Sequence, residues 1–221
     1  MTEPRDPETH SQTPTFDSAF QGGLETLFRW RRDVRHFRTD SLPHGLAEHL
    51  LTMADLAPSV GNSQPWRFIQ VNTEDTRARI IADFERCNAQ ALANQDPGRQ
   101  DLYARLKLEG LRASPLHLAV FCDEGTDQGH GLGQDTMPET RRYSVVMAIH
   151  TLWLAARAKG VGVGWVSILN PREVARILET PPDWTFVAYL CIGWPRDNTE
   201  VPELERLGWQ ARRGKVETVE R

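Results

Sequence analysis

The feature that most constrains the fold is a strong helical pattern over 141–159 that leads directly into a glycine-rich strand pattern over 161–168. Apolar side chains recur in the first segment at the spacing of one helix face, at Val145, Ile149, Leu152, Trp153 and Ala156. Gly160 suits the end of this helix, because glycine readily adopts the left-handed conformation found just after a helix. The chain is therefore expected to combine helices with strands.

The rest of the chain continues this mixture. Helices are predicted over 19–31, 43–56 (with Ser41 as the candidate cap), 74–93, about 98–113, and from Asn170-Pro171 to just before 181–182. Strands are predicted over 66–71, 116–122 and 185–193. Because helices outnumber strands and the two do not alternate regularly, the expected fold class is α+β.

The two ends of the chain differ from its middle. Residues 1–17 are polar and rich in proline, and they are predicted to form a disordered tail, which leaves 18–221 as a single domain. Residues 194–221 are polar, with Leu204, Leu207 and Trp209 as isolated apolar anchors. We expect this C-terminal segment to wrap a neighbouring subunit.

Composition excludes several classes of function. The formal net charge is −4 and the basic residues are scattered, which argues against a nucleic-acid-binding surface. Cys87, Cys122 and Cys191 are far apart and match neither a disulfide framework nor a metal site. No apolar run reaches the length of a membrane span, and the polar start does not read as a signal peptide. A soluble cytoplasmic protein is expected.

Residues 31–37 (RRDVRHF) place three arginines around one carboxylate. Guanidinium groups bind phosphate in a bidentate manner, and in an extended segment Arg31, Asp33 and Arg35 would share one face. Two interpretations stay open for this segment, an anion-binding cluster or a solvated charged surface. The neighbouring His36 has the same alternatives, as a ligand of anions or as an exposed spacer.

Residues 57–66 (APSVGNSQPW) lie between a predicted helix and a predicted strand. Ser59, Asn62, Ser63 and Gln64 offer hydrogen-bond donors and acceptors around Gly61, as the edge of a heterocyclic ligand requires. The alternative interpretation is an ordinary polar turn.

Residues 160–167 (GVGVGWVS) contain a G-x-G-x-G pattern. This is not the dinucleotide-binding fingerprint, because the spacing differs and the pattern follows a helix and begins a strand. Glycine inside a strand instead indicates close approach by a ligand or by another backbone. Ser167 stands at the end of this strand, where it is either a catalytic side chain or a capping hydroxyl for the next helix.

Two other features bear on a possible site. His117, inside an apolar strand, is predicted to be a hydrogen-bonded core histidine rather than a ligand. The glycine-rich loop 124–139 and the broken helical segment 88–110 are candidates for a lid over an active site.

Taken together, these segments resemble the nitroreductase-like flavoproteins, and within them the 5,6-dimethylbenzimidazole synthase (BluB-type) family. The resemblance covers about residues 24–213 and is carried by RRDVRHF, APSVGNSQPW, LKLEG (106–110), YSVVMAIHTLWLAARAKGVGVGWVSIL (143–169) and PEL...GW (202–209). Ordinary nitroreductases usually carry serine in the arginine-led motif where this chain has Asp33. Residues 137–142 are more basic than the resemblance leads us to expect.

The resemblance implies a mostly antiparallel sheet flanked by helices, and a homodimer with the flavin at its interface. It implies an oxidoreductase of cobalamin biosynthesis that uses dioxygen to fragment reduced FMN into 5,6-dimethylbenzimidazole, the lower ligand of cobalamin, and erythrose 4-phosphate. The reduced FMN would come from a separate flavin reductase that uses NAD(P)H. Two alternatives stay open: an NAD(P)H-dependent nitroreductase or quinone reductase, which Asp33 disfavours, and a flavin-binding protein without catalytic activity.

The resemblance also implies roles for individual residues. Asp33 and Ser167 would form the catalytic pair, and the carboxylate would stay ionised among the guanidiniums and accept protons. The flavin-binding residues would be Arg31, Arg32, Asp33, Val34, Arg35, Ser59, Gly61, Gln64, Gly164 and Ser167. No residue is assigned to a metal.

Overall fold

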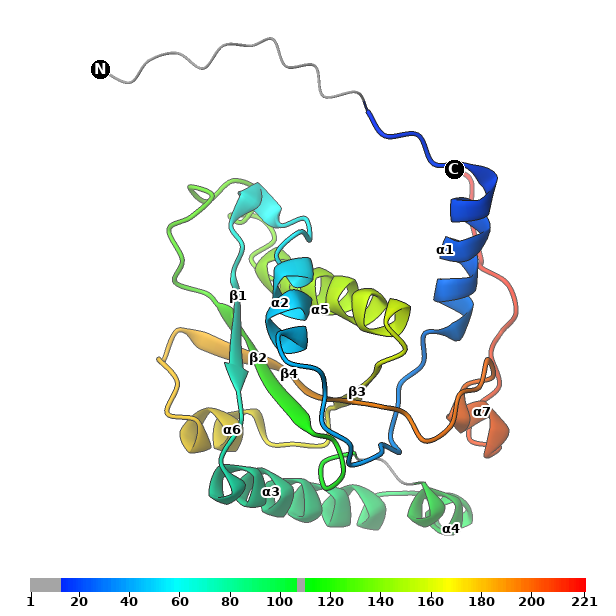
Figure 1. Ribbon diagram of the computed structural model, residues 1–221. Coiled ribbons are helices and arrows are strands. Elements are labelled where there is room, and N and C mark those ends of the chain that lie inside the picture. The colour runs from blue at the N-terminus through cyan, green and yellow to red at the C-terminus, as the bar shows by residue number, and fades with distance from the viewer. Residues whose placement is uncertain (1–12, 107–109) are drawn as a thin grey trace.

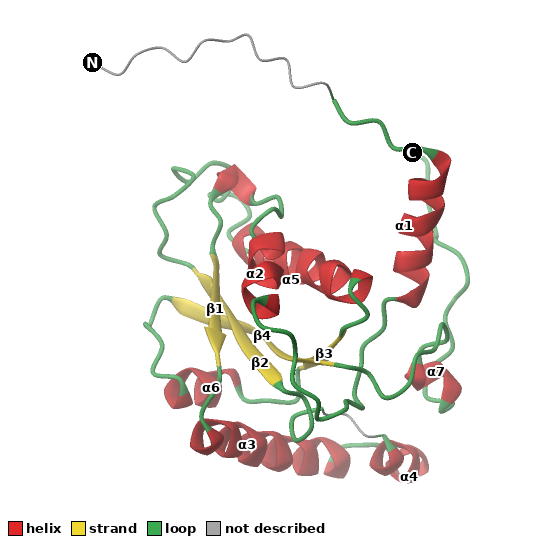
Figure 2. Cartoon of the chain, in the orientation of Figure 1, coloured by secondary structure: helices red, strands yellow, loops and turns green. Residues whose placement is uncertain are grey.

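A computed structural model describes residues 13–106 and 110–221 of the chain. Within these residues, four strands form one sheet in the order β1-β2-β4-β3, and each neighbouring pair is antiparallel (Figure 2). The strands are β1 (Trp66–Gln70), β2 (Leu116–Asp123), β3 (Gly162–Val166) and β4 (Trp184–Gly193). The expected α+β class with an antiparallel sheet is confirmed.

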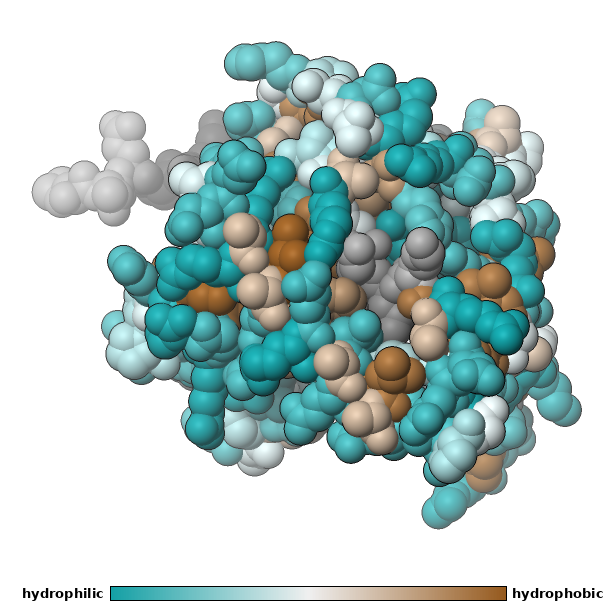
Figure 3. All heavy atoms as spheres, turned by 90° about the horizontal axis from the view of Figure 1, so that it is seen from below, coloured by the Kyte–Doolittle hydropathy of each residue, from teal (hydrophilic) through white to brown (hydrophobic). Residues whose placement is uncertain are grey.

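Helices cover both faces of this sheet (Figure 1). The described helices are α1 (Ser18–Trp30), α2 (Leu46–Ala54), the short 3₁₀ helix η1 (Val60–Asn62), α3 (Glu74–Ala93), α4 (Pro97–Arg105), α5 (Thr140–Ala158), α6 (Pro171–Ile177) and α7 (Glu203–Arg206). One core cluster joins α2 and α5 to one face, and a second joins α3 and α6 to the other. The outer face seen from below is mostly hydrophilic (Figure 3).

Alternation along β2 explains this three-layer arrangement. Leu118 and Val120 point into the cluster of α2 and α5, whereas Ala119 and Phe121 point into the cluster of α3 and α6. The strand is central, so both of its faces are buried and it reads in the sequence as a continuous apolar run. The strong helical pattern predicted over 141–159 is α5, which packs on one face of the sheet.

His117 is the polar exception in this strand, and the structure confirms it as a core histidine. Its side chain is fully buried, with Nδ1 2.9 Å from the hydroxyl of Tyr189 and Nε2 2.9 Å from the hydroxyl of Ser114. Burial lowers the pKa of His117 to about 4. The ring is therefore neutral at physiological pH, and it provides hydrogen-bond partners for two buried hydroxyl groups.

Two predicted helices differ from the observed ones. The helix predicted from Pro43 begins only at Leu46, and its cap is Gly45 in a left-handed conformation (φ +78°) rather than Ser41. The helix predicted to reach 113 ends at Arg105, and part of the remainder (107–109) lies outside the described residues. A β-carbon on Gly110 would overlap the ring of the buried Phe37, so this position has no room for a larger residue.

Helix α1 lies beside the sheet, and none of its residues is buried (Figure 1). Asp17 caps it by accepting from the N–H of Phe20 at 2.8 Å, so this residue, which was predicted to end the tail, belongs to the helix cap. Residues 1–12 of that tail lie outside the described residues. Phe16, Phe20, Leu24 and Phe28 repeat every four residues and are between 37 and 56 % exposed. They form an apolar stripe, which we call the α1 stripe.

The residues after β4 fold back along their own chain (Figure 1). The N–H of Arg196 donates to the carbonyl of His36 at 2.9 Å. Further on, the ring of Trp209 meets Tyr103 of α4 with centroids 6.2 Å apart, and the guanidinium of Arg99 lies 5.5 Å from the Trp209 ring centre. These contacts are made within one chain, and a wrap around a neighbouring subunit is not shown. None of the described helices has the length and apolar composition needed to cross a membrane.

The segment 31–37 lies along the free edge of β3. The N–H of Val34 donates to the carbonyl of Val163 at 3.0 Å, and Asp33 forms a parallel bridge with Val163. A β-carbon on Gly164 would overlap the carbonyl oxygen of Val34, and one on Gly162 would press against the Val34 side chain at 2.8 Å. Of the two interpretations of this glycine pattern, close approach by another backbone is therefore the one that the structure shows.

Gly164→Ala is expected to lift residues 31–37 off the strand and to lower the free energy of unfolding by about 1–3 kcal/mol, the usual cost of overpacking. Gly22→Ala is the matched control, because Gly22 lies inside α1 with nothing within 4 Å of the added carbon, and it should be neutral or slightly stabilising. Urea unfolding of both variants measures the difference. Equal stability of Gly164→Ala and the wild-type chain would contradict this packing.

Candidate functional site

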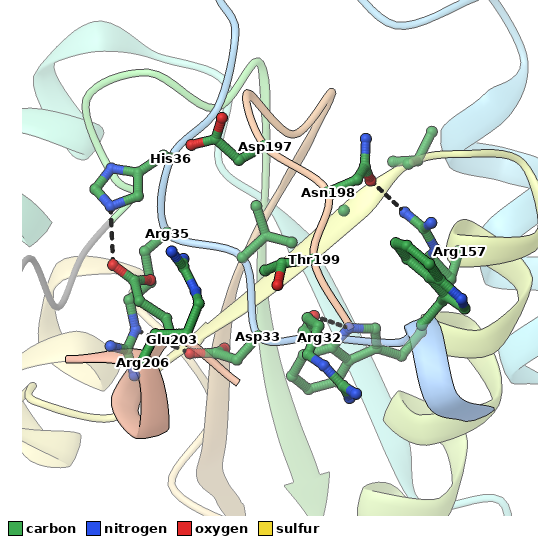
Figure 4. Close-up of a pocket in the computed structure, with 15 residues that line it drawn as sticks. Arg32, Asp33, Arg35, His36, Arg157, Asp197, Asn198, Thr199, Glu203 and Arg206 are labelled. Atoms are coloured by element: carbon green, nitrogen blue, oxygen red, sulfur yellow. Dashed lines mark hydrogen bonds and ion pairs between the residues drawn. The ribbon is translucent and has the colours of Figure 1, made fainter. Parts of the chain in front are cut away.

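A pocket opens where segment 31–37, the end of α5 and the residues after β4 meet (Figure 4). Its charged lining residues are Arg32, Asp33, Arg35, Arg157, Asp197, Glu203 and Arg206, and His36, Asn198 and Thr199 complete its polar wall. Arg32, Asp33, Val34 and Arg35 were expected at a binding site, and the structure brings these four together. The pocket therefore lies between the arginine motif and residues 197–206, which follow β4 and which we call the C-terminal wall.

Asp33 occupies a central position in this pocket. Its Oδ1 accepts from the N–H of Trp165 at 2.9 Å, and its Oδ2 lies 3.1 Å from Nε of Arg35. The surrounding protein raises the pKa of the carboxyl group by desolvation, and the Trp165 N–H and Arg35 oppose that rise only in part. About a third of the side chain (36 %) still faces the cavity. The flanking cations thus do less to favour the charged form than the sequence suggested.

Arg35 has an unused hydrogen-bond donor. Its side chain is 12 % exposed, Nε is paired with Asp33, and Nη1 is buried without a partner among the residues that the structure describes. A buried guanidinium N–H without an acceptor costs free energy, and native structures seldom leave one. Since Arg35 lines the pocket, an anionic or carbonyl oxygen placed there would remove that cost.

Positive charge is crowded at the other side of the same segment. The pKa of Arg32 is lowered, first by burial and then by repulsion from Arg31, Arg212 and Arg157, although Glu200 partly offsets this. Arg32 already donates to the backbone carbonyl of Glu200, at 2.7 Å from Nε. The excess of cations over anions is the condition under which an added anion binds favourably.

Arg31 is set apart from its neighbours in the motif. Its guanidinium lies over the ring of Trp153 in α5, 5.3 Å from the centroid, and it is not among the residues that line the pocket. Trp153 in turn donates from Nε1 to the carbonyl of Arg32 at 3.1 Å. Arg31, Asp33 and Arg35 were expected to share one face; Asp33 and Arg35 are in contact, whereas the side chain of Arg31 is directed to α5.

The C-terminal wall contains residues that the sequence analysis missed. Glu203 lies 3.1 Å from Nε2 of His36, and Asn198 accepts from Arg157 at 2.6 Å (Figure 4). Arg206 also lines the pocket, beside Glu203 (Figure 4). The only sequence signal was the run of polar residues directly after the last strand, where side chains at the end of a buried sheet become accessible.

Ser167 follows the last residue of β3 and is exposed. The side chain of Asn170, not Ser167, caps α6, because it accepts from the N–H groups of Arg172 at 3.0 Å and Glu173 at 3.4 Å. The capping interpretation of Ser167 is therefore wrong. Ser167 lies two residues beyond Trp165, whose N–H binds Asp33, and it is not among the residues that line the pocket.

The segment 57–66 lies elsewhere. Ser59, Gly61 and Gln64 are not among the residues that line the Asp33 pocket, and η1 is at the opposite end of α5 from the end that borders it (Figure 1). The turn is strained, since Asn62 (φ +56°) and Gln64 (φ +42°) both adopt a conformation that favours glycine. Such strain is typical of functional turns, but one chain does not bring this turn to Asp33.

The loop 124–139 packs on this turn. Gln128 donates from Nε2 to the carbonyl of Asn62 and to Oε1 of Gln64, both at 2.9 Å. Arg141 and Arg142 hold the two ends of the loop together by binding the backbone and the side chain of Glu124. The unexpectedly basic residues before α5 thus have a local structural role, and the loop is docked on the Ser59–Gln64 region.

Comparisons with known proteins identify the family to which this sequence and fold belong. Residues 28–194 match the model of the Nitroreductase family. The chain belongs to the nitroreductase family. Relatives named 5,6-dimethylbenzimidazole synthase come from Rhodospirillum rubrum, 68 % identical over 200 residues (90 % of this chain and 95 % of the relative), and Rhodobacter capsulatus, 47 % identical over 195 residues (88 % and 94 %). Within the nitroreductase family the chain therefore groups with these synthases, and it is an oxidoreductase.

Solved structures show the same nitroreductase fold. An oxidised iodotyrosine deiodinase bound to FMN and 3-iodo-L-tyrosine is 26 % identical, with a TM-score of 0.69 over 90 % of this chain and 97 % of that one. A BluB-like flavoprotein from Clostridium difficile 630 is 21 % identical, with a TM-score of 0.63 over 81 % of this chain and 93 % of that one. The second likeness shows the fold alone.

Replacing Asp33 by Asn is expected to stabilise the folded chain at neutral and alkaline pH. A carboxyl whose pKa is raised on folding penalises the native state above that pKa, and the penalty disappears as the pH falls through it. The amide oxygen of Asn still accepts from the Trp165 N–H. The Tm of Asp33→Asn should thus exceed that of the wild-type chain at about pH 8, and the gap should narrow toward about pH 4.

Asp40→Asn is the control for this measurement, because the Asp40 carboxylate is 61 % exposed and pairs only with the exposed Arg38. Its Tm should follow the wild-type value at both pH values. A lower Tm for Asp33→Asn at alkaline pH would show that burial does not dominate at Asp33.

Proposed function

We propose that this chain is a 5,6-dimethylbenzimidazole synthase that uses dioxygen to fragment reduced FMN into 5,6-dimethylbenzimidazole and erythrose 4-phosphate, in the cytoplasm. A separate flavin reductase, supplied with NAD(P)H, would deliver the reduced FMN. The observation that carries the proposal is the partly buried carboxyl of Asp33, with its raised pKa, in a pocket rich in arginine, in a chain 68 % identical to a relative named for this product.

The described residues fit a flavin mononucleotide. The unpartnered Nη1 of Arg35 and the crowded cations around Arg32 suit a phosphate or a polar ring edge. Arg206 adds a further guanidinium from the C-terminal wall. Arg32 and the backbone of Val34 would hold the cradle in place, and Gly164 keeps this backbone close to β3.

Asp33 is the group suited to move protons beside the ligand. Its carboxyl is fixed by Trp165 and Arg35, and its raised pKa brings it closer to the range in which a carboxyl both accepts and returns a proton. When bound, reduced FMN would supply the electrons for dioxygen and the ring carbons of the product. Ser167, which follows the last residue of β3, would orient oxygen species or relay a proton by its hydroxyl.

We place the Ser59 turn in the same site through a second copy of the chain. Ser59, Gly61 and Gln64 are away from Asp33 within one chain, so a site that uses both segments needs a homodimer. Apolar surface for such an interface is present. The α1 stripe is exposed, and Tyr143, Val146 and Met147 on α5 are between 40 and 55 % exposed.

The reaction is tested by incubating the chain with FMN, NADPH, a flavin reductase and air, and by measuring 5,6-dimethylbenzimidazole chromatographically. Asp33→Asn should lower product formation by about 10²–10⁴-fold, the range for a lost acid–base group, while FMN binding is largely kept. Asp40→Asn serves again as the control. Undiminished product from Asp33→Asn would remove Asp33 from the reaction.

Two other outcomes would replace the proposed function itself. Rapid oxidation of NADPH with a nitroaromatic compound, without added flavin reductase, would indicate a nitroreductase. FMN that is bound but remains intact would indicate a flavin-binding protein without this activity.

The shared site is tested by mixing two inactive variants, Asp33→Asn and Ser59→Phe, which carry their lesions on different segments. If each site takes Asp33 from one chain and Ser59 from the other, a mixed dimer contains one intact site. Random exchange of subunits should then restore about a quarter of the wild-type activity. Absence of any recovery, with subunit exchange verified by mass spectrometry, would contradict a site that takes Asp33 from one chain and Ser59 from the other.

A further inference from the structure

Asp83 of α3 is a buried carboxylate that the proposed chemistry does not use. Its side chain is 2 % exposed, and its Oδ2 accepts from the backbone N–H of Asn170 at 2.7 Å. Oδ1 pairs with Arg86, whose side chain is 55 % exposed at the surface. Burial of a carboxylate is costly unless its oxygens are hydrogen-bonded, so these partners hold the group in one orientation.

The bond to Asn170 fixes one end of a short connection, residues 165–170. At the other end, the N–H of Trp165 donates to Oδ1 of Asp33 at 2.9 Å. Pairing between β3 and β4 ends at Val166, and α6 begins at Pro171. Two carboxylates from distant parts of the chain thus hold the amides at both ends of a connection that contains Ser167.

From this arrangement we infer that Asp83 is a positioning residue that places the Ser167 hydroxyl relative to Asp33. The inference rests on the proposed function, because it gives a reason for the position of a residue proposed to act on the flavin. Asp83 does not touch the pocket and acts through the backbone of the 165–170 connection. The charge on Asp83 strengthens its bond to the Asn170 N–H, because a carboxylate is a stronger acceptor than a neutral group.

Two other contacts hold the C-terminal part of this connection, but neither of them accepts the backbone N–H of Asn170. Leu169 is buried in the cluster of α3 and α6, and the side chain of Asn170 is occupied in capping α6. Without Asp83 the Asn170 N–H would lose its acceptor in a partly buried setting, and the connection that carries the exposed Ser167, three residues earlier, would lose one of its fixed ends. A displacement of about 1 Å is enough to lower turnover by about 10²-fold.

Asp83→Ala, Asp83→Asn and Arg86→Gln test this inference in the full-length chain. Asp83→Ala should lower the turnover of reduced FMN about ten- to hundred-fold and leave FMN affinity, measured by fluorescence titration, near the wild-type value. Asp83→Asn keeps an oxygen that accepts from Asn170 and should recover most of the turnover. Arg86→Gln removes the charged partner of Oδ1 but leaves the bond from the Asn170 N–H to Oδ2, so its turnover should stay close to that of the wild-type chain.

A double-mutant cycle with Ser167→Ala identifies the route of the effect. If Asp83 acts through Ser167, then Asp83→Ala should cause less than about a twofold further loss in the Ser167→Ala background. Additive losses would overturn the inference, and so would a lowered Tm with unchanged turnover, since both are expected of a purely structural residue.

Backbone amide hydrogen exchange supplies a readout that needs no product. In Asp83→Ala, protection should fall in 165–170 and stay unchanged in α5. Unchanged protection in 165–170 would overturn the inference. Absence of 5,6-dimethylbenzimidazole from the wild-type chain would instead overturn the proposed function, and the exchange result would still decide whether Asp83 fixes this connection.

Discussion

The structure depends on the packing of an extended segment, residues 31–37, against the outer edge of β3. Edge strands leave backbone groups unpaired, and these must be satisfied by other means. Here Val34 supplies a backbone N–H to Val163, and the carboxylate of Asp33 accepts the N–H of Trp165 in place of a backbone carbonyl. Gly162 and Gly164 make room for this segment. The residue proposed for catalysis is thus also part of the sheet's own hydrogen bonding.

That double role explains the electrostatics of the pocket. A carboxylate used as a strand-edge acceptor is necessarily close to the sheet, where desolvation raises its pKa. The arginines around it are themselves held by backbone carbonyls or aromatic rings, as Arg32 is by Glu200 and Arg31 by Trp153. Their charges are therefore only partly neutralised within the chain. Such a site is costly to fold and ready to accept an anion, a combination often found where stability is exchanged for function.

Local patterns in the sequence were sufficient for much of the fold. The helix predicted over 74–93 is α3, with Thr73 as its cap, and the helix closed by Gly160 is α5. These elements follow from hydrophobic spacing and caps, which are encoded within a few residues. Alternation along an extended segment likewise predicted Asp33 and Arg35 on one face, and their side chains are in contact there.

What the sequence did not reveal depends on contacts between distant residues. The close packing of Gly110 against Phe37 is one such contact, and the pocket wall at Glu203, which follows from the fold of the chain after β4, is another. Nor could spacing show that the Ser59 turn and Asp33 lie apart, or that burial outweighs the arginines at Asp33. Each of these results from the tertiary arrangement, which local propensity does not contain.

The covered edge of β3 also has a consequence for how this chain is made. The acceptor Asp33 and the donor Trp165 are 132 positions apart in the sequence. On the ribosome, residues 31–37 are synthesised long before β3. They therefore cannot pack against this strand until Trp165 has been translated. Closing so large a loop is a late and slow event. Until then residues 31–37 have no strand to pack against, and it is at this stage of biosynthesis that chaperones would matter most.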